Sequence, residues 1–444
     1  MIELSPEVVA IAMLGGVLVL VLTGYPLAYV VGIIALVVGF FVWQGQVSQM
    51  LYLRAQKIML NYTLLAVPLF VFMGVMLERS GIIERLYDVL YLWLGGFRGG
   101  LAIVTVIVGT IMAATVGIIT ASVTLLTLVA LPSMIKRGYS KSFAAGACTA
   151  GGVLGILIPP SIMIVLYGPM AELSVGRLFF GAFVPGFILS ALYMSYIVIR
   201  SLIQPNIAPP VPLEERAIPF VQKTTKLLVA LVPPAILIMS VLGVIFMGIA
   251  APTEAAGIGA FAATLLTIAY RRFTWDVLKE VTLLTAKLSG FILLVGSMSF
   301  AYTGVFLGSG GGKVVADLIL ATPGGRWAAF AVIMFICFLL GMFIDWIGII
   351  FIMVPIITPI GEALGFDSIW FAIMICVNLQ TSFMTPPFAM AIYICRGAAD
   401  PSLGVTVADI IRGVIPFVIL ILIGLALLVI FPNLILWLPS MMIR

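Results

Sequence analysis

Histidine is absent from this chain of 444 residues, and charged residues make up only 9% of it. The absence of histidine removes the commonest metal ligand and proton shuttle of proteins. The sequence also lacks a Walker motif, a dinucleotide-binding glycine pattern followed by an acid, and a Ser/His/Asp set. A soluble domain carries about 25% charged residues. These absences argue against a soluble enzyme.

Cysteine is scarce as well, with four residues that all lie in apolar segments: Cys148, Cys337, Cys376 and Cys395. No CxxC pair or metal-ligand spacing connects them, so free buried thiols are expected. The net charge of +5 does not indicate nucleic-acid binding, because membrane proteins carry a surplus of Lys and Arg in cytoplasmic loops. No cofactor is expected from the motifs.

Hydrophobic residues are abundant instead, at 63% of the chain. Long stretches contain no charged residue at all: 8–53, 99–135, 288–312 and 413–443. A transmembrane helix needs about 20 such residues, so the chain is predicted to cross a lipid bilayer several times. The first stretch does not resemble a cleaved signal peptide, because only Glu3 and Glu7 precede it and a second apolar segment follows.

The chain divides into two similar halves. A polar, proline-rich linker at 200–226 separates a first repeat at 1–199 from a second at 227–444. Shifted by about 230 positions, Pro26 faces Pro252, Gly74 faces Gly304, and the Pro-Pro pair at 159–160 faces the pair at 386–387. Chance similarity between two apolar halves is the alternative, but the matches keep one order and nearly one spacing.

Each half shows the same series of segments. In the first half, spans are predicted near 8–22, 26–43 and 63–79, then a segment at 99–135, then spans near 142–171 and 178–199. In the second half they fall near 227–248, 253–270 and 281–307, then 327–361, then 368–395 and 413–437. The stretch 84–98 alternates charges with apolar residues and is predicted to be an interfacial amphipathic helix.

The segment at 99–135 has an unusual length. As one helix it would be about 55 Å long, whereas the hydrocarbon core is about 30 Å thick. Two full crossings and a turn would need roughly 45 residues. Small and hydroxylated residues fill its middle, which suits a re-entrant hairpin with its tip inside the membrane. The segment 327–361 has the same length problem, with Gly341, Asp345 and Gly348 in its middle.

Two re-entrant hairpins give each half five crossings, and an odd number inverts the second half. The distribution of Lys and Arg supports this topology with both termini outside the cytoplasm. In that orientation, more of these residues lie in cytoplasmic loops than in loops on the other side of the membrane. The inside set is Arg79, Arg85, Arg98, Lys136, Arg137, Lys141, Arg200, Arg216, Lys223, Lys226, Arg271, Arg272, Lys279, Arg396 and Arg412. The outside set is Arg54, Lys57, Arg177, Lys313, Arg326 and Arg444, while Lys287 lies within a span.

Two further spans are predicted to be broken helices. The span 142–171 contains Gly155 before Pro159-Pro160-Ser161, and 368–395 contains Asn378 and Thr385 before Pro386-Pro387. Proline removes a backbone donor and frees carbonyls of the preceding turn. Free carbonyls beside hydroxyls and amides suit Na⁺, and half-helix N-termini attract carboxylates. A simple proline kink is the alternative interpretation of each span.

One cation site is therefore predicted where each hairpin tip meets the broken span of its own half. The first uses Thr115, Gly117, Gly155 and the carbonyls before Pro159, and the second uses Asp345, Gly348, Asn378 and Thr385. Hydroxyls at these places are candidates for the substrate: Thr115, Thr120, Ser122, Ser161, Ser382 and Thr385. Asp345 is the only charged residue between Arg326 and Glu362, and capping the hairpin tip is its alternative role.

Several of these stretches resemble the large membrane subunit of TRAP (tripartite ATP-independent periplasmic) transporters, of the dicarboxylate-permease type. They are 67–74, 131–139, 155–161, 252–255, 341–345 and 385–387, and the resemblance that they carry extends over nearly the whole chain. The resemblance implies an all-α elevator-type transporter of the wider ion-transporter superfamily, in a bacterial or archaeal inner membrane. It implies Na⁺ coupling, a separate small membrane subunit, and a periplasmic substrate-binding protein that delivers an organic anion.

One departure concerns the first hairpin tip. Many relatives have a Ser-Gly-Ser type of tip, whereas this chain has Met112-Ala113-Ala114-Thr115, followed by Thr120 and Ser122. The hydroxyls that serve the first cation site therefore stay open. A proton-coupled carrier is the nearest alternative function, since Asp345 could serve either ion. A structural subunit of an energy-coupling complex is further away, because it predicts intramembrane His or Lys/Glu relays that the sequence lacks.

Overall fold

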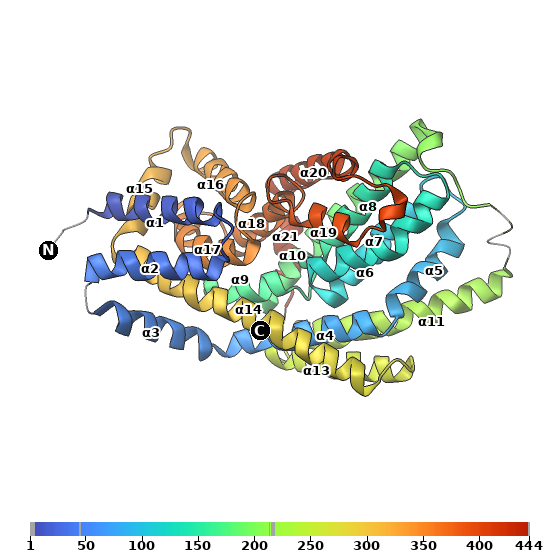
Figure 1. Ribbon diagram of the computed structural model, residues 1–444, viewed down its shortest axis with the longest axis horizontal. Coiled ribbons are helices and arrows are strands. Elements are labelled where there is room, and N and C mark those ends of the chain that lie inside the picture. The colour runs from blue at the N-terminus through green and yellow to red at the C-terminus, as the bar shows by residue number, and fades with distance from the viewer. Residues whose placement is uncertain (1–4, 44–45, 213, 215–217, 443–444) are drawn as a thin grey trace.

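The computed structural model describes residues 5–43, 46–212, 214 and 218–442, and every regular element within them is a helix (Figure 1). The predicted all-α class is therefore confirmed. Arg216 and Arg444, which entered the charge count, lie outside the described residues, as does part of the linker at 200–226. Eight helices of the described part are long and apolar enough to cross a membrane.

The first half opens with helices α1 (Pro6–Val21), α2 (Leu27–Trp43) and α3 (Val47–Met59). A short 3-10 turn (Tyr62–Leu65) leads into α4 (Ala66–Arg79) and the amphipathic α5 (Ile82–Leu94). Helix α3 was not predicted, because Arg54 and Lys57 interrupt its apolar pattern. The helix at 84–98 was predicted, and its buried face holds Leu86, Tyr87 and Leu90.

Hairpin 1 follows, made of α6 (Gly100–Val116) and α7 (Ile119–Lys136), with only Gly117 and Ile118 between the two helices. The next span is interrupted as predicted: α8 (Lys141–Val153) ends in a 3-10 turn (Leu154–Ile156), and α9 (Ile162–Met170) begins after the two prolines. Helix α10 (Val175–Ile203) completes the half, and a 3-10 turn (Pro205–Ile207) starts the linker.

The second half repeats this series of helices. It begins with α11 (Phe220–Ile238), a π-helical turn (Met239–Gly243) and α12 (Val244–Phe246), and continues with α13 (Pro252–Ala269) and α14 (Trp275–Gly308). Where the first half has α3 and α4 joined by a turn, the second half has the single 34-residue α14. Helix α15 (Gly311–Leu320) stands in the place of α5.

Hairpin 2 consists of α16 (Gly325–Gly341) and α17 (Trp346–Ala363), and the second broken span of α18 (Ser368–Ser382) and α19 (Met390–Ala398). A 3-10 turn (Pro401–Leu403), α20 (Val407–Ile430) and α21 (Asn433–Ser440) end the described chain. The prediction of one span at 413–437 was wrong in its extent. Helix α20 ends at Ile430, because Pro432 cannot continue it, and α21 is separate.

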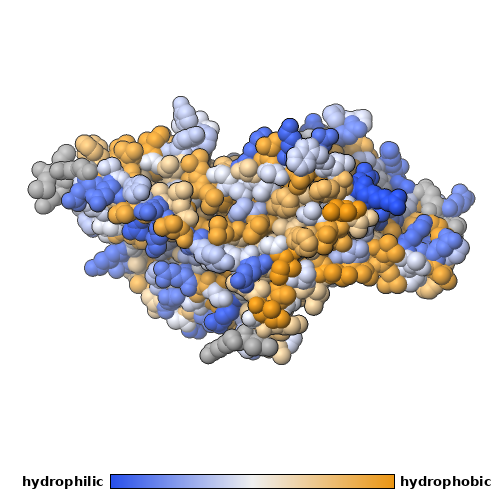
Figure 2. Space-filling view, turned by 90° about the horizontal axis from the view of Figure 1, so that it is seen from below, coloured by the Kyte–Doolittle hydropathy of each residue, from blue (hydrophilic) through white to orange (hydrophobic). Residues whose placement is uncertain are grey.

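The arrangement of the helices places both hairpin tips near the middle of the molecule. The base of hairpin 1 lies towards α5 and that of hairpin 2 beside α15, at opposite ends of the long axis (Figure 1). Large apolar side chains such as Phe40, Phe261 and Ile419 are more than half exposed, and apolar residues cover much of the face in Figure 2. Such a surface suits hydrocarbon rather than water, and the chain is a multi-pass membrane protein.

Close backbone contact joins the first broken span to the second half. Helix α8 crosses α20 at Gly146 and Gly413, where a side chain on Gly413 would overlap the Ser142 carbonyl oxygen. Helix α4 meets the end of α6 in the same manner, since a side chain on Gly74 would overlap the Val116 carbonyl oxygen. Small residues allow such approach of helices in membranes.

Candidate functional site

The tip of hairpin 1 lies against the first broken span. Gly117 has a φ of +67°, a conformation that glycine adopts readily, and it ends α6. A Cβ atom on Gly117 would stand 3.1 Å from the Pro160 carbonyl oxygen, and one on Gly155 would stand 2.8 Å from Ser122 Oγ. The structure thus brings together two residues of the predicted first cation site, Gly117 and Gly155, with the backbone of the proline pair.

The hydroxyls near this tip differ in how they are engaged. Thr115 Oγ1 donates to the carbonyl oxygens of Ile111 at 3.1 Å and Met112 at 3.2 Å, within its own helix. Ser161 Oγ donates to the Ile156 carbonyl oxygen. Ser122 Oγ is buried against Gly155 of the broken span, without a hydrogen-bond partner among the described residues.

Hairpin 2 lies against the second broken span in the same way. The Phe388 N–H donates to the carbonyl oxygen of Met342 at the tip, at 3.0 Å. Asn378 Nδ2 donates to the Met334 carbonyl oxygen at 2.7 Å, and Ser382 Oγ donates to that of Phe338 at 3.4 Å. Helix α18 is thereby tied along α16 by polar side chains that would otherwise be unpaired in an apolar surrounding.

The other residues of the predicted second site lie apart from these bonds. Thr385 Oγ1 donates to the Thr381 carbonyl oxygen of its own span at 2.7 Å. A Cβ atom on Gly348 would overlap the side chain of Leu27 in α2. This side of Gly348 therefore faces α2 and not the broken span. Of the predicted set, Asn378 is therefore placed by a contact to hairpin 2, whereas Gly348 has its nearest side-chain neighbours elsewhere.

Both tips line one small cavity of about 100 Å³. Its wall takes Gly117 to Thr120 from hairpin 1, Asp345 to Ile347 from hairpin 2, Ile162 from α9, Met390 from α19, and Val71, Leu288, Phe291 and Ile292 from α4 and α14. Helices α7, α9, α17 and α19 begin at Ile119, Ile162, Trp346 and Met390, so four helix N-termini meet at this cavity. Unpaired N–H groups and the helix dipole make each N-terminus attractive to an anion.

A carboxylate stands among these N-termini. Asp345 occupies the N-cap position of α17, and its Oδ1 is buried with no hydrogen-bond partner in the described part of the chain. A buried negative charge without a partner costs several kcal/mol, and a bound anion would repel it. A cation at this place would compensate the charge of an ionised Asp345 while an anion occupies the cavity.

Sequence reasoning missed parts of the site. The apolar residues of α14 that line the cavity gave no signal, because only the fold brings that helix to the hairpin tips. Gln380, in α18, was not assigned to a site, yet its Oε1 and Nε2 are both buried without a partner among the described residues. The available signal was an amide within an apolar span, where unpaired polar groups are costly.

The chain is similar to known proteins over most of its length. The chain matches the family model described as "Tripartite ATP-independent periplasmic transporter, DctM component" over residues 14–434. It is 31% identical over 382 residues to the C4-dicarboxylate TRAP transporter large permease protein DctM of Pseudomonas aeruginosa, covering 86% of this chain and 87% of that protein. It is 29% identical over 388 residues to the sialic acid TRAP transporter large permease protein SiaM of Vibrio cholerae, with 86% of this chain and 87% of that protein covered.

A solved structure shares the fold at lower identity. The crystal structure of the Alcanivorax borkumensis YdaH transporter superimposes with a TM-score of 0.60 at 16% identity, covering 90% of this chain and 89% of that one. This likeness shows the fold alone. The resemblance seen in the sequence is confirmed by the family match and the relatives, and the chain belongs to the DctM family, the large permease component of TRAP transporters.

Proposed function

We propose that this chain imports an organic anion by Na⁺ symport, through the cavity where the two hairpin tips meet. The observation that carries the proposal is the convergence of four helix N-termini on that cavity beside the carboxylate of Asp345, whose Oδ1 has no partner among the described residues. The N-termini favour the carboxylate of a substrate, and Asp345 requires a cation. A permease that binds anion and cation together moves them together.

The cation is proposed to be Na⁺ at two places. One lies between the tip of hairpin 1 and the first broken span, with Thr115, Gly117, Gly155 and the Pro159 carbonyl as candidates. The other lies at the tip of hairpin 2, with Asp345, Gly348, Asn378 and Thr385 as candidates. Hard cations take oxygen ligands, and unwound backbone at such depth must face protein or a lined cavity. The contact of Gly117 with Pro160 supports the first place.

The substrate is proposed to be a carboxylate or related acid, bound near Thr120, Ser122 and Ser161 on one side and Ser382 and Thr385 on the other. Thr120 lines the cavity directly and is exposed. The names of the two relatives, C4-dicarboxylate and sialic acid transporters, agree with an anionic substrate. A small membrane subunit and a periplasmic binding protein are the proposed partners, in a bacterial inner membrane, and an elevator motion the proposed mechanism.

Reconstitution tests the proposal. The chain is placed in proteoliposomes with its small subunit and binding protein, and uptake of the anion carried by that binding protein is measured. We expect uptake with an inward Na⁺ gradient, little uptake when K⁺ replaces Na⁺, and little when either partner is left out. Uptake that follows a proton gradient without Na⁺ would favour the proton-coupled alternative, and full-rate uptake by this chain alone would refute the need for partners.

A further inference from the structure

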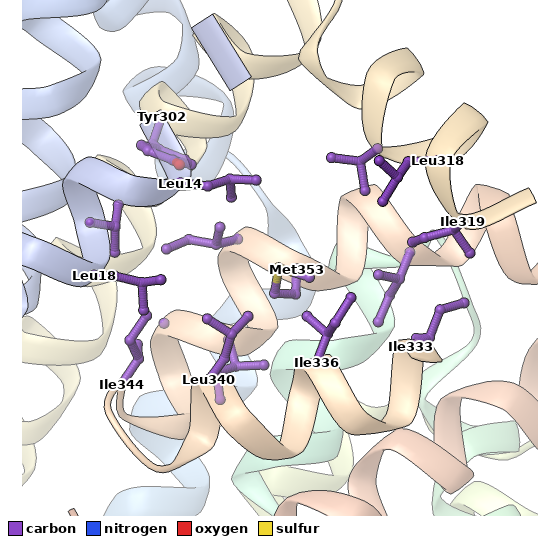
Figure 3. A pocket seen from close by; sticks show the side chains of 16 residues that line it. Leu14, Leu18, Tyr302, Leu318, Ile319, Ile333, Ile336, Leu340, Ile344 and Met353 are labelled. Carbon is purple, nitrogen blue, oxygen red and sulfur yellow. The ribbon is translucent and has the colours of Figure 1, made fainter. Parts of the chain in front are cut away.

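A second cavity lies between hairpin 2 and helices α1, α14 and α15 (Figure 3). Its volume is about 270 Å³. Its walls are formed almost entirely by aliphatic side chains, among them Leu14, Leu318, Ile336, Leu340 and Met353. An apolar cavity of about 150 Å³ already stays dry and takes up benzene, so this one is large enough for a longer hydrocarbon.

The walls of the cavity indicate where a ligand would enter. Leu318 of α15 lines the cavity and is also 71% exposed, so the cavity opens beside α15 to the outer surface of the protein. On α16, Ile333, Ile336 and Leu340 follow the i, i+3, i+7 spacing of one helix face and point inward (Figure 3). Because this is a membrane protein and Leu318 is apolar, we infer that the medium outside the opening is lipid.

Charged residues of α15 and α16 lie near the opening and bear on which lipid headgroup could bind there. Lys313 lies in the first turn of α15, two residues before Val315, which lines the cavity. Arg326 is the second residue of α16, and its guanidinium lies over the rings of Trp327 at 5.3 Å and Phe366 at 5.5 Å. Both cations are exposed, and so are the acids Asp317 on α15 and Glu362 and Asp367, which flank Phe366 in the sequence. Lys313 is the cation of α15, the helix that lines the cavity, and its ammonium group suits a phosphate.

We propose that this cavity is a phospholipid site, which holds one acyl chain while the phosphate of the same lipid lies at Lys313. Burial of hydrocarbon is worth about 0.8 kcal/mol for each CH₂ group, and the cation fixes the headgroup end. Only Tyr302 contributes a polar atom to the wall, and its hydroxyl is buried without a partner among the described residues. The acyl chain therefore packs against a wall that offers water almost no hydrogen-bonding groups.

The position of the site gives the lipid a role at hairpin 2. Ile344 and Gly348 line the cavity and flank Asp345 in the sequence. An acyl chain in the cavity fills the space behind the hairpin tip, because it packs between the hairpin and α1. We expect it to hold the tip in the position seen here, as a packed side chain would. This inference rests on the membrane location of the chain and not on its transport activity.

Photolabelling tests the proposal without a transport measurement. The chain and its small subunit are reconstituted in phosphatidylethanolamine vesicles that contain a trace of phosphatidylglycerol with a diazirine in its acyl chain. After irradiation, adducts are located by peptide mass spectrometry. We expect adducts on the inward residues Ile336, Leu340 and Met353, which lipid around the outside of the protein does not reach.

Two variants on neighbouring positions sharpen the test. Ile336→Trp fills the cavity and should lower these adducts at least threefold, whereas Phe335→Trp, on the exposed side of α16, should leave them unchanged. Lys313→Gln should lower them about twofold without filling anything. Adducts confined to outward residues in the wild-type protein, adducts that Ile336→Trp does not reduce, or crosslinks from these residues to the small subunit would each overturn the proposal. The positions of the adducts in the wild-type protein test the proposal even if Ile336→Trp fails to fold.

Discussion

At the scale of single residues, Asp345 is the group on which the proposed cation coupling depends. It is the N-cap residue of α17, it lines the cavity between the tips, and its Oδ1 has no partner within the described residues. A capping role alone would use the carboxylate on the N–H groups of its own helix. The two roles predict different responses to Na⁺, since only a cation ligand changes ion affinity.

Asp345→Asn keeps the shape of the side chain and removes its charge. We expect the Na⁺ concentration for half-maximal uptake to rise about tenfold, because a contact to a charged group contributes about 1.5–3 kcal/mol. Protein abundance should fall much less. Asp317→Asn, an exposed acid on α15, serves as the control and should behave as wild type. An unchanged Na⁺ dependence in Asp345→Asn would make this residue a structural cap.

Gly117 permits a second comparison between matched residues. Gly117 and Gly325 both have positive φ, +67° and +73°, but a Cβ on Gly117 meets the Pro160 carbonyl oxygen, while one on Gly325 meets nothing within 4 Å. The backbone cost of alanine, about 1–2 kcal/mol, is shared by both variants. Gly117→Ala should therefore lose most Na⁺-dependent uptake and Gly325→Ala should retain it. Equal loss in both would show that backbone strain, and not the contact at the tip, matters.

The sequence predicted the hairpin tips and broken spans better than the orientation of their side chains. Glycines, prolines and one carboxylate in apolar segments indicated both hairpin tips and both broken spans, because such residues are costly in a bilayer unless the backbone is interrupted. It did not show that the hydroxyls of Thr115 and Thr385 are engaged with their own helices, nor that Gly348 faces Leu27. Rotamers and helix rotation depend on neighbours that one sequence does not identify.

At the scale of elements, interrupted helices position the site and close helix crossings hold them. Their lengths and the residues in their middles predicted that 99–135 and 327–361 fold back on themselves, and the structure has turns of a few residues there. The short helices α3 and α15 were missed, since each mixes charged and apolar residues over fewer than 14 positions. The contact of α8 with α20 was also invisible, because two glycines far apart in sequence form it.

The crossing of α8 and α20 gives a prediction about stability. Gly413→Ala places a methyl group against the Ser142 carbonyl oxygen, and overpacking of this kind costs about 1–3 kcal/mol. We expect the melting temperature of the purified protein to fall by several degrees. Gly257→Ala on α13 meets nothing within 4 Å and should leave the melting temperature unchanged. If Gly413→Ala melts like wild type, the helices do not cross as closely as described.

At the scale of the whole molecule, the two hairpins approach the cavity from opposite ends (Figure 1), as expected for halves of opposite orientation. The count of Lys and Arg predicts that both termini lie on the periplasmic side. Ser5 and Ser440 are exposed, and the four native cysteines are buried. A thiol reagent should therefore label only cysteines that are introduced at exposed positions.

Labelling of Ser5→Cys and Ser440→Cys in spheroplasts checks this orientation. A membrane-impermeant thiol reagent should modify both positions in intact spheroplasts. A cysteine at the exposed Thr225 of α11, near the linker, should react only after permeabilisation. Labelling of Ser5→Cys or Ser440→Cys that requires permeabilisation would contradict the predicted topology and with it the charge assignment.

The central claim is that Na⁺ binds at the hairpin tips, and the melting temperature of the purified chain measures this most directly, without any substrate. A ligand that binds only the folded state stabilises it by about 2.7 kcal/mol at one hundred times its dissociation constant. We expect a higher melting temperature in NaCl than in KCl or choline chloride at equal ionic strength, and a smaller difference in Asp345→Asn. Equal melting temperatures in NaCl and KCl for the wild-type protein would contradict it.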